Sequence, residues 1–201
     1  VYKRQLPVYP VEADFMRQVP LPDAVRGMPK LGFFPGSTIG NMVARTAVDL
    51  LRNMRETLGE GAQLLIGMDL IKDTGVLIAA YDDAAGVTAD FNTNLVRRIN
   101  RELGGDIPLD RFAHEARWND EYARVEMHLV AQSDLTFTVD GHSYSMVAGE
   151  TIHTENSHKF NRRTSNMLLL ASGWEPQARW LDDEDRFSLI LAEAKPNRSA
   201  P

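Results

Sequence analysis

Two short apolar runs on either side of an amphipathic segment limit the folds open to this chain. The runs cover residues 30–34 and 63–68, and between them apolar residues recur at helical spacing until Gly59 ends the pattern. Strands that are apolar throughout and joined by a helix are typical of a parallel sheet covered on both faces. An earlier apolar run, residues 6–13, is expected to add another strand. The sequence therefore predicts an α/β fold.

The middle of the chain follows other patterns. The pair Asp73-Thr74 predicts a helix cap, followed by a short helix that ends near Tyr81. A longer helix is expected from Thr88 until the pair Gly104-Gly105 ends it. The apolar face of this longer helix is predicted to consist of Phe91, Leu95, Ile99 and Leu103.

Strands are predicted after these two helices. Residues 123–129 alternate strictly between apolar and polar side chains, which indicates a half-buried antiparallel strand. The turn Asp140-Gly141 predicts a hairpin between residues 135–139 and 142–146. After residues 151–157, a helix through 167–171 and strands near 177–181 and 187–191 are expected to close the chain.

These patterns divide the chain into segments. We expect residues 6–71 to form an α/β domain and residues 72–161 to form an inserted α+β lobe, which is large enough to fold as a unit. Residues 162–193 are expected to return to the first sheet, and residues 194–201 to form a disordered tail.

The composition of the 201 residues excludes several classes of protein. The net charge is −6 without a basic block, so neither nucleic acid nor a membrane is an expected partner. Because there are no cysteines, disulfides, thiolate metal sites and a cysteine nucleophile are excluded. No apolar run approaches roughly 18 residues and no signal-peptide pattern is present, so we expect a cytoplasmic protein. The five histidines lack ligand-like spacing, so we expect no metal site.

Two loops at predicted strand ends carry polar side chains suited to a ligand. In an open α/β sheet, ligands bind outside the carboxyl ends of the strands. Asp14 and Phe15 follow the first run; a carboxylate accepts from amines and a ring covers a purine face. Residues 36–41 follow the second run and combine two glycines with the polar side chains of Thr38 and Asn41. The alternatives are a plain turn with a core ring at the first loop and a helix cap at the second.

Five stretches of the chain resemble the L-histidine Nα-methyltransferase family: FFPGSTIGN, LLIGMDLIKDTGVLIAAYDDAAGVTADFN, NRELGGDI, HEARWND and GETIHTENSHKF. The resemblance extends from about Val11 to Ala192. It implies a Rossmann-like class I methyltransferase sheet with an inserted α+β substrate-binding lobe. It also implies S-adenosyl-L-methionine as cofactor and L-histidine as small-molecule substrate. The product would be trimethylhistidine (hercynine), in the first step of ergothioneine biosynthesis, and we expect a monomer.

The resemblance also implies roles for residues of the first domain. Asp14 and Phe15 match the pair that contacts the adenine end of the methyl donor. Asn41 matches the residue that binds the amino-acid portion of the substrate, and Gly36 and Thr38 line the same place. No residue is assigned to accept the amine proton.

In the inserted lobe, the resemblance implies four substrate-binding residues. Tyr81 would reach the substrate carboxylate, Glu155 and Ser157 would bind the imidazole, and Met127 would pack against that ring. A neutral imidazole has one N–H donor and one acceptor nitrogen, so a carboxylate and a hydroxyl suit it. The alternatives are that Met127 is an ordinary core residue and that Glu155 and Ser157 lie in a surface loop.

The resemblance places the family's glycine-rich loop upstream of Val1. We therefore expect the chain to be the carboxy-terminal part of a longer enzyme and inactive alone. Two other hypotheses remain open: methylation of another amino acid or an indole derivative, and a non-catalytic binding fragment.

Overall fold

The computed structural model describes residues 7–196 and divides into two compact units. The first, which we call the sheet unit, consists of the residues up to 70 together with those from 160 onwards. The second, the inserted lobe, consists of residues 71–159. Leu70 and Phe160 form an isolated parallel bridge, so the chain leaves the sheet unit and returns to it at adjacent positions. No described helix is long and apolar enough to cross a membrane.

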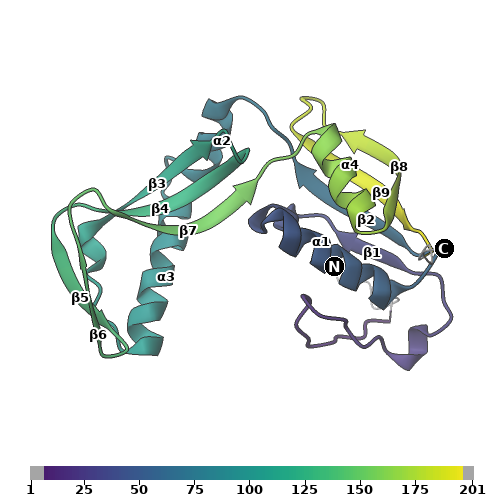
Figure 1. Ribbon diagram of the computed structural model, residues 1–201, viewed down its shortest axis with the longest axis horizontal. Coiled ribbons are helices and arrows are strands. Elements are labelled where there is room, and N and C mark those ends of the chain that lie inside the picture. Colours follow the sequence, from purple (N-terminus) through teal and green to yellow (C-terminus); the bar gives the residue numbers. More distant parts are fainter. Residues whose placement is uncertain (1–6, 197–201) are drawn as a thin grey trace. The chain divides into compact units, whose positions relative to one another are not determined.

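The sheet unit is built on four strands in the order β1-β2-β9-β8 (Figure 1). The first pair is parallel, whereas β9 runs antiparallel to both of its neighbours. These strands confirm the predicted α/β sheet. Their bounds are β1, Leu31–Phe34; β2, Gln63–Asp69; β8, Trp174–Leu181; and β9, Phe187–Ala194.

Helices α1 (Ala44–Leu58) and α4 (Arg162–Ala171) pack against each other and against the sheet (Figure 1). The core between them contains fully buried side chains from both helices and from β2, β8 and β9. Trp174 is one of these, and its indole N–H donates to the Leu51 carbonyl at 2.8 Å. This buried hydrogen bond satisfies the polar atom that the indole brings into the core. Short 3₁₀ turns occur at Asp23–Val25 (η1) and Thr38–Asn41 (η2).

Two sequence predictions about the sheet unit are wrong. Residues 7–13 form no strand, because none of the described strands pairs with them, and a strand needs a hydrogen-bonded neighbour. The sheet is also not covered on both faces within the described residues, since Leu31 and Phe33 of β1 are 56% and 67% exposed. An apolar run indicates a strand but does not show what covers it.

The inserted lobe combines an antiparallel sheet with two helices. Its strands β3 (Phe112–Asn119), β4 (Arg124–Ala131) and β7 (Thr151–His158) lie in that order, and β4 is the antiparallel strand that alternation predicted. Helices α2 (Thr74–Tyr81) and α3 (Val87–Leu103) contact β3 and β4. The remaining elements are the predicted hairpin of β5 (Leu135–Val139) and β6 (His142–Met146), and a 3₁₀ turn η3 at Leu109–Arg111.

The helices of the lobe begin and end where the sequence predicts, but one buried face differs. The Asp73 carboxylate caps α2 by accepting from the Val76 amide at 3.1 Å. On α3, the predicted inward residues Phe91, Leu95 and Leu103 are exposed, and the buried residues are Asn92 and Val96. The reason is polar: Asn92 donates to His114 and to the His128 carbonyl, so hydrogen bonding turns a neighbouring face of the helix to the sheet.

The strand β3 was not predicted from the sequence, because apolar and polar residues do not alternate cleanly along it: His114 interrupts the face of Phe112, Ala116 and Trp118. The predicted disordered tail lies mostly outside the described residues. Its first residue, Ala194, is instead the fully buried last residue of β9.

Candidate functional site

The loop that follows β1 presents three of the predicted substrate-binding residues. Gly36, Thr38 and Asn41 are all exposed, and the last two belong to η2. Helix α1 starts only at Ala44, with Val43 as its N-cap and without a side-chain cap bond. Asn41 is therefore not a helix cap, which removes the structural alternative for this residue.

The same loop is held in place by contacts to the end of β2. Ser37 adopts a left-handed backbone conformation with φ 56°, and its hydroxyl accepts from the Asp69 amide at 2.9 Å. Beneath it, β2 passes so close that a Cβ on Gly67 would lie 1.9 Å from the Pro35 carbonyl oxygen. Ile39 is fully buried and anchors the loop in the core. The polar residues of the loop thus project from a fixed backbone.

The two predicted cofactor-binding residues, Asp14 and Phe15, occupy a turn. The Asp14 carboxylate accepts from the Met16 amide at 2.9 Å, and the Asp14 carbonyl accepts from the Arg17 amide at the same distance. This is the turn that the sequence left open as an alternative for Asp14. Phe15, however, is 49% exposed rather than a core ring.

Phe15 lines an apolar cavity of about 190 Å³ in the sheet unit. The other walls are largely hydrophobic and come from β1 and α1, including Phe33, Met54 and Leu58. A flat aromatic group is the kind of ligand that such walls accommodate.

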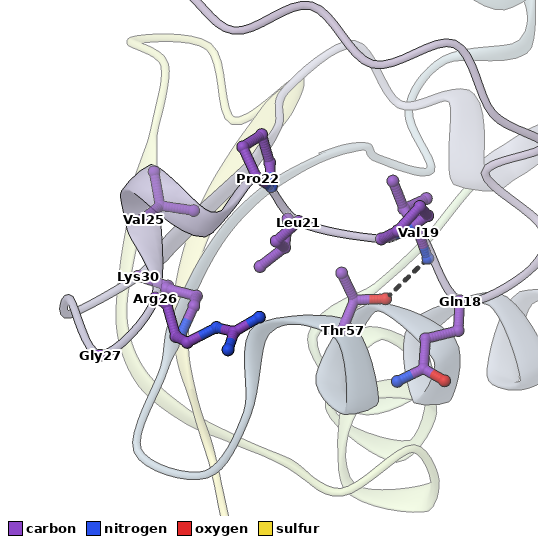
Figure 2. A pocket seen from close by; sticks show the side chains of 10 residues that line it. Gln18, Val19, Leu21, Pro22, Val25, Arg26, Gly27, Lys30 and Thr57 are labelled. Carbon is purple, nitrogen blue, oxygen red and sulfur yellow. Dashed lines mark hydrogen bonds between the residues drawn. The ribbon is translucent and has the colours of Figure 1, made fainter.

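A different pocket of about 400 Å³ lies along the loop that precedes β1 (Figure 2). It is lined by nine residues of that loop, between Gln18 and Lys30, and by Thr57, whose hydroxyl accepts from the Val19 amide at 3.2 Å. None of the predicted site residues lines this pocket.

Within the inserted lobe, the structure brings two predicted residues into direct contact. Tyr81 is the last residue of α2 and Ser157 lies on β7, and their hydroxyl oxygens are 2.7 Å apart. The buried ammonium of Lys159 donates to both oxygens, at 2.8 Å to Tyr81 and 2.9 Å to Ser157. Lys159 was not predicted as a site residue, although its position two residues after Ser157 places it on the same side of the chain.

Met127 and Glu155 are the other two predicted residues of the lobe, and they are paired neighbours. Met127 of β4 lies opposite Glu155 of β7 in the antiparallel register. Ser157, two residues further along β7, shares the face of Glu155. Met127 is 3% exposed, so it is a core residue of the lobe as well as a neighbour of Glu155.

The environment of Glu155 differs from that of a surface glutamate. Its side chain is partly buried, and burial raises the pKa of its carboxyl. The register between β4 and β7 shifts directly beside it, between Met127 and His128, and the displaced Thr154 donates its hydroxyl to the Met127 carbonyl at 2.9 Å. Such bulges redirect the side chains next to them. The surface-loop alternative for Glu155 and Ser157 is therefore wrong, since both lie within a strand.

A cluster that the sequence did not predict lies on the other face of the same sheet. Glu126, His128 and His153 offer ligand atoms within 4.8 Å of one another. The two imidazoles are stacked, with centroids 4.6 Å apart and planes at 20°. Ring nitrogens bind metals in the plane of the ring, so nearly parallel rings do not converge on one ion, and the Glu126 carboxylate already accepts from Arg124 and Asn119. This arrangement is an ionic and hydrogen-bonded network rather than a prepared metal centre.

The fold defines the class of the protein. The order β1-β2-β9-β8, with the last strand inserted antiparallel, and a lobe inserted after β2 form part of a Rossmann-like class I methyltransferase. The chain belongs to the S-adenosylmethionine-dependent, histidine-specific methyltransferase family, whose model matches residues 2–194.

Two curated relatives agree with this assignment. A histidine N-alpha-methyltransferase from Mycolicibacterium smegmatis is 42% identical over 165 residues, which cover 81% of this chain and 51% of the relative. One from Mycobacterium tuberculosis is 39% identical over 181 residues, covering 86% and 54%. The chain thus spans about half the length of these curated relatives. Among solved structures, the CcbJ methyltransferase from Streptomyces caelestis has a TM-score of 0.47 at 13% identity, covering 93% of this chain and 64% of that one.

Proposed function

We propose that the full-length protein methylates the α-amino group of L-histidine with S-adenosylmethionine and carries the reaction to trimethylhistidine, within ergothioneine biosynthesis. The observation that carries this proposal is the arrangement of the lobe. There, the partly buried Glu155 carboxylate and the Ser157 hydroxyl share one face of β7, beside Met127. An acceptor, a hydroxyl and an apolar wall are the groups that recognise a neutral imidazole.

Residues of the sheet unit are suited to the amino and carboxylate groups of an amino acid and to the adenine of the cofactor. The exposed Asn41 side chain and the backbone at Gly36 and Thr38 are suited to the amino and carboxylate groups of an amino acid. The apolar cavity beside Phe15 would receive the adenine of the cofactor, and the neighbouring Asp14 would accept from its exocyclic amine. When bound, the cofactor supplies the methyl group.

The contribution of the protein to this reaction is orientation. Methyl transfer would be an in-line displacement by the lone pair of the free amine. The methylated amine would lose a proton after the first and the second transfer, whereas the trimethylated product has no N–H proton to lose. Residues that hold the free amine in line act by reducing the entropic cost of reaching the transition state. Within the lobe, Glu155 and Ser157 would fix the imidazole ring of the substrate.

The proposal is tested by incubating the full-length protein with the cofactor and each of several amino acids, including histidine and tryptophan, and measuring product masses. We expect a gain of one, two and finally three methyl groups on histidine. No mass gain on histidine would disprove the proposed substrate, and a gain on tryptophan instead would favour the indole alternative.

The variant Glu155→Ala tests the placement of the imidazole. Loss of a charge-assisted hydrogen bond costs about 1.5–3 kcal/mol, which corresponds to a loss of about 10- to 150-fold in histidine affinity. Tryptophan should bind relatively better, and Met127→Val should shift the preference in the same direction. The matched control is Glu121→Ala, which removes an exposed carboxylate from the same lobe. Calorimetric titration measures all of these, and wild-type histidine affinity in Glu155→Ala would contradict the placement.

A further inference from the structure

Lys159 is a buried lysine in the proposed substrate-binding lobe. It directly follows β7 and is 3% exposed, which is rare for a residue whose ammonium is strongly hydrated in water. Its Nζ atom lies within hydrogen-bond distance of Tyr81 and Ser157 and 4.5 Å from the centre of the Tyr81 ring. Its backbone amide donates to the Ala123 carbonyl at 2.8 Å, so the backbone is held as firmly as the side chain.

The three polar groups form a triangle in which the number of hydroxyl hydrogens is known. An ammonium has donors only, so the oxygens of Tyr81 and Ser157 both accept from Lys159. The two oxygens are also 2.7 Å apart, so one hydroxyl donates to the other. Two hydroxyl hydrogens are present and this contact uses one of them. A single hydroxyl hydrogen therefore remains that can donate to a group outside the triangle.

The chemistry of the two hydroxyls determines which hydrogen remains. A phenol is more acidic than an aliphatic alcohol and is the better donor, whereas the alcohol oxygen is the better acceptor. These preferences favour Tyr81 as the donor and Ser157 as the acceptor in this contact. The Ser157 oxygen then accepts from Tyr81 and from Lys159 with both of its lone pairs, and its own hydrogen points away from both.

We propose that Lys159 is a positioning residue for Ser157: together with Tyr81 it occupies the acceptor capacity of the Ser157 oxygen, so that this hydroxyl presents a donor to the acceptor nitrogen of the imidazole. The inference rests on the proposed function, since it takes histidine as the ligand. It also has a consequence for Tyr81. While the Tyr81 hydroxyl donates its hydrogen to Ser157, it cannot donate to the substrate carboxylate, so the predicted contact with the carboxylate requires this hydrogen bond to break.

The arrangement makes the site selective for a neutral imidazole. With Ser157 as donor and Glu155 as acceptor, the lobe matches a ring that carries one N–H and one acceptor nitrogen. A ring with an N–H alone would leave the Ser157 hydrogen without a partner, and an unpaired buried polar group reduces affinity.

Two ligands separate this role from a merely structural one. Histidine is compared with its analogue in which pyrrole replaces imidazole, because pyrrole keeps the ring N–H and lacks the acceptor nitrogen. Calorimetric titrations use the full-length protein saturated with the demethylated cofactor. In Lys159→Met we expect histidine affinity to fall by about 10-fold or more, since a charge-assisted network is lost, while affinity for the pyrrole analogue changes by less than about 3-fold.

Double variants test the same network. Because Lys159 acts through Ser157, Lys159→Met combined with Ser157→Ala should bind histidine only about as weakly as Ser157→Ala alone. The control is Lys195→Met, which removes an ammonium paired with Glu193 in the sheet unit and should leave both affinities unchanged. If Lys159→Met does not fold, Lys159→Arg replaces it. The planar guanidinium keeps the charge but not the geometry. It should again weaken the binding of histidine more than the binding of the pyrrole analogue.

The proposal is overturned if Lys159→Met loses equal affinity for the two ligands or loses no affinity for histidine. It is also overturned if the losses of histidine affinity are fully additive in the double variant. Failure of the proposed function is recognised separately, because wild-type protein would then fail to bind or methylate histidine at all.

Discussion

The contact between β2 and the loop after β1 yields a specific prediction for Gly67→Ala. A Cβ at this position would lie 1.9 Å from the Pro35 carbonyl oxygen and 2.7 Å from the Pro35 carbonyl carbon. Both are backbone atoms, so no side chain can rotate away. To restore a separation of 3.0 Å, the loop or the strand must move by at least about 1.1 Å, and interiors resist such shifts.

The magnitude follows from this displacement. Overpacking of a core by one methyl group costs about 1–3 kcal/mol of unfolding free energy, and backbone rather than side-chain movement places Gly67→Ala at the upper end. The moved loop carries Gly36, Thr38 and Asn41. A misplacement of about 1 Å at a site of this kind can lower the rate about 100-fold. We therefore expect loss of stability together with loss of the proposed methyl transfer to histidine.

A matched control lies on the neighbouring strand. In Gly32→Ala, the new Cβ would meet only the ends of two leucine side chains, Leu58 at 2.9 Å and Leu64 at 3.1 Å. Side-chain ends can shift by a few tenths of an ångström, so this variant should lose less than about 1 kcal/mol. Urea unfolding of both full-length variants and the initial rate of Gly67→Ala provide the measurement. Equal stability of the two variants, or a wild-type rate for Gly67→Ala, would refute the argument that the Pro35 contact holds the loop. The rate of Gly32→Ala is not part of the comparison, because Gly32 lines the cavity beside Phe15.

Three further predictions concern stability. Trp174→Phe removes a fully buried indole N–H that donates to the Leu51 carbonyl, and should lower the free energy of unfolding by about 2–3 kcal/mol, as measured by urea unfolding. A loss below about 0.5 kcal/mol would mean that the core relaxes around the change. Asp73→Ala removes the cap of α2 and should cost about 1 kcal/mol, whereas Asp73→Asn should retain most of it. Burial acts to raise the pKa of Glu126, but hydrogen bonds from Arg124, His128 and Asn119 outweigh it and lower that pKa from 4.5 to about 2. Because the folded-state pKa is depressed, this stabilisation is present above pH 4.5 and is lost as the pH falls towards about 2, and Glu126→Gln should flatten that part of the stability–pH curve.

Local patterns were sufficient for most of the elements. The helix after β1, the capped helix ending at Tyr81, the alternating strand β4 and the hairpin at Asp140-Gly141 each depend on contacts between near neighbours in the sequence. The resemblance to the histidine methyltransferases likewise rests on contiguous motifs, and the family match confirms it. The predicted roles of the individual site residues stay predictions.

Long-range contacts decided the features that the sequence did not reveal. Residues 7–13 are apolar but lack a strand partner, and the buried face of α3 follows the hydrogen bonds of Asn92 rather than its apolar residues. Lys159 has no motif to distinguish it, and its contact with Tyr81 joins residues 78 positions apart. The sequence by itself determined the α/β class, the helix boundaries and the family, because periodicity, caps and motifs are local. Only the tertiary structure decided which polar groups meet in the lobe, because a hydrogen bond between distant residues depends on strand register and helix orientation, which no single segment specifies.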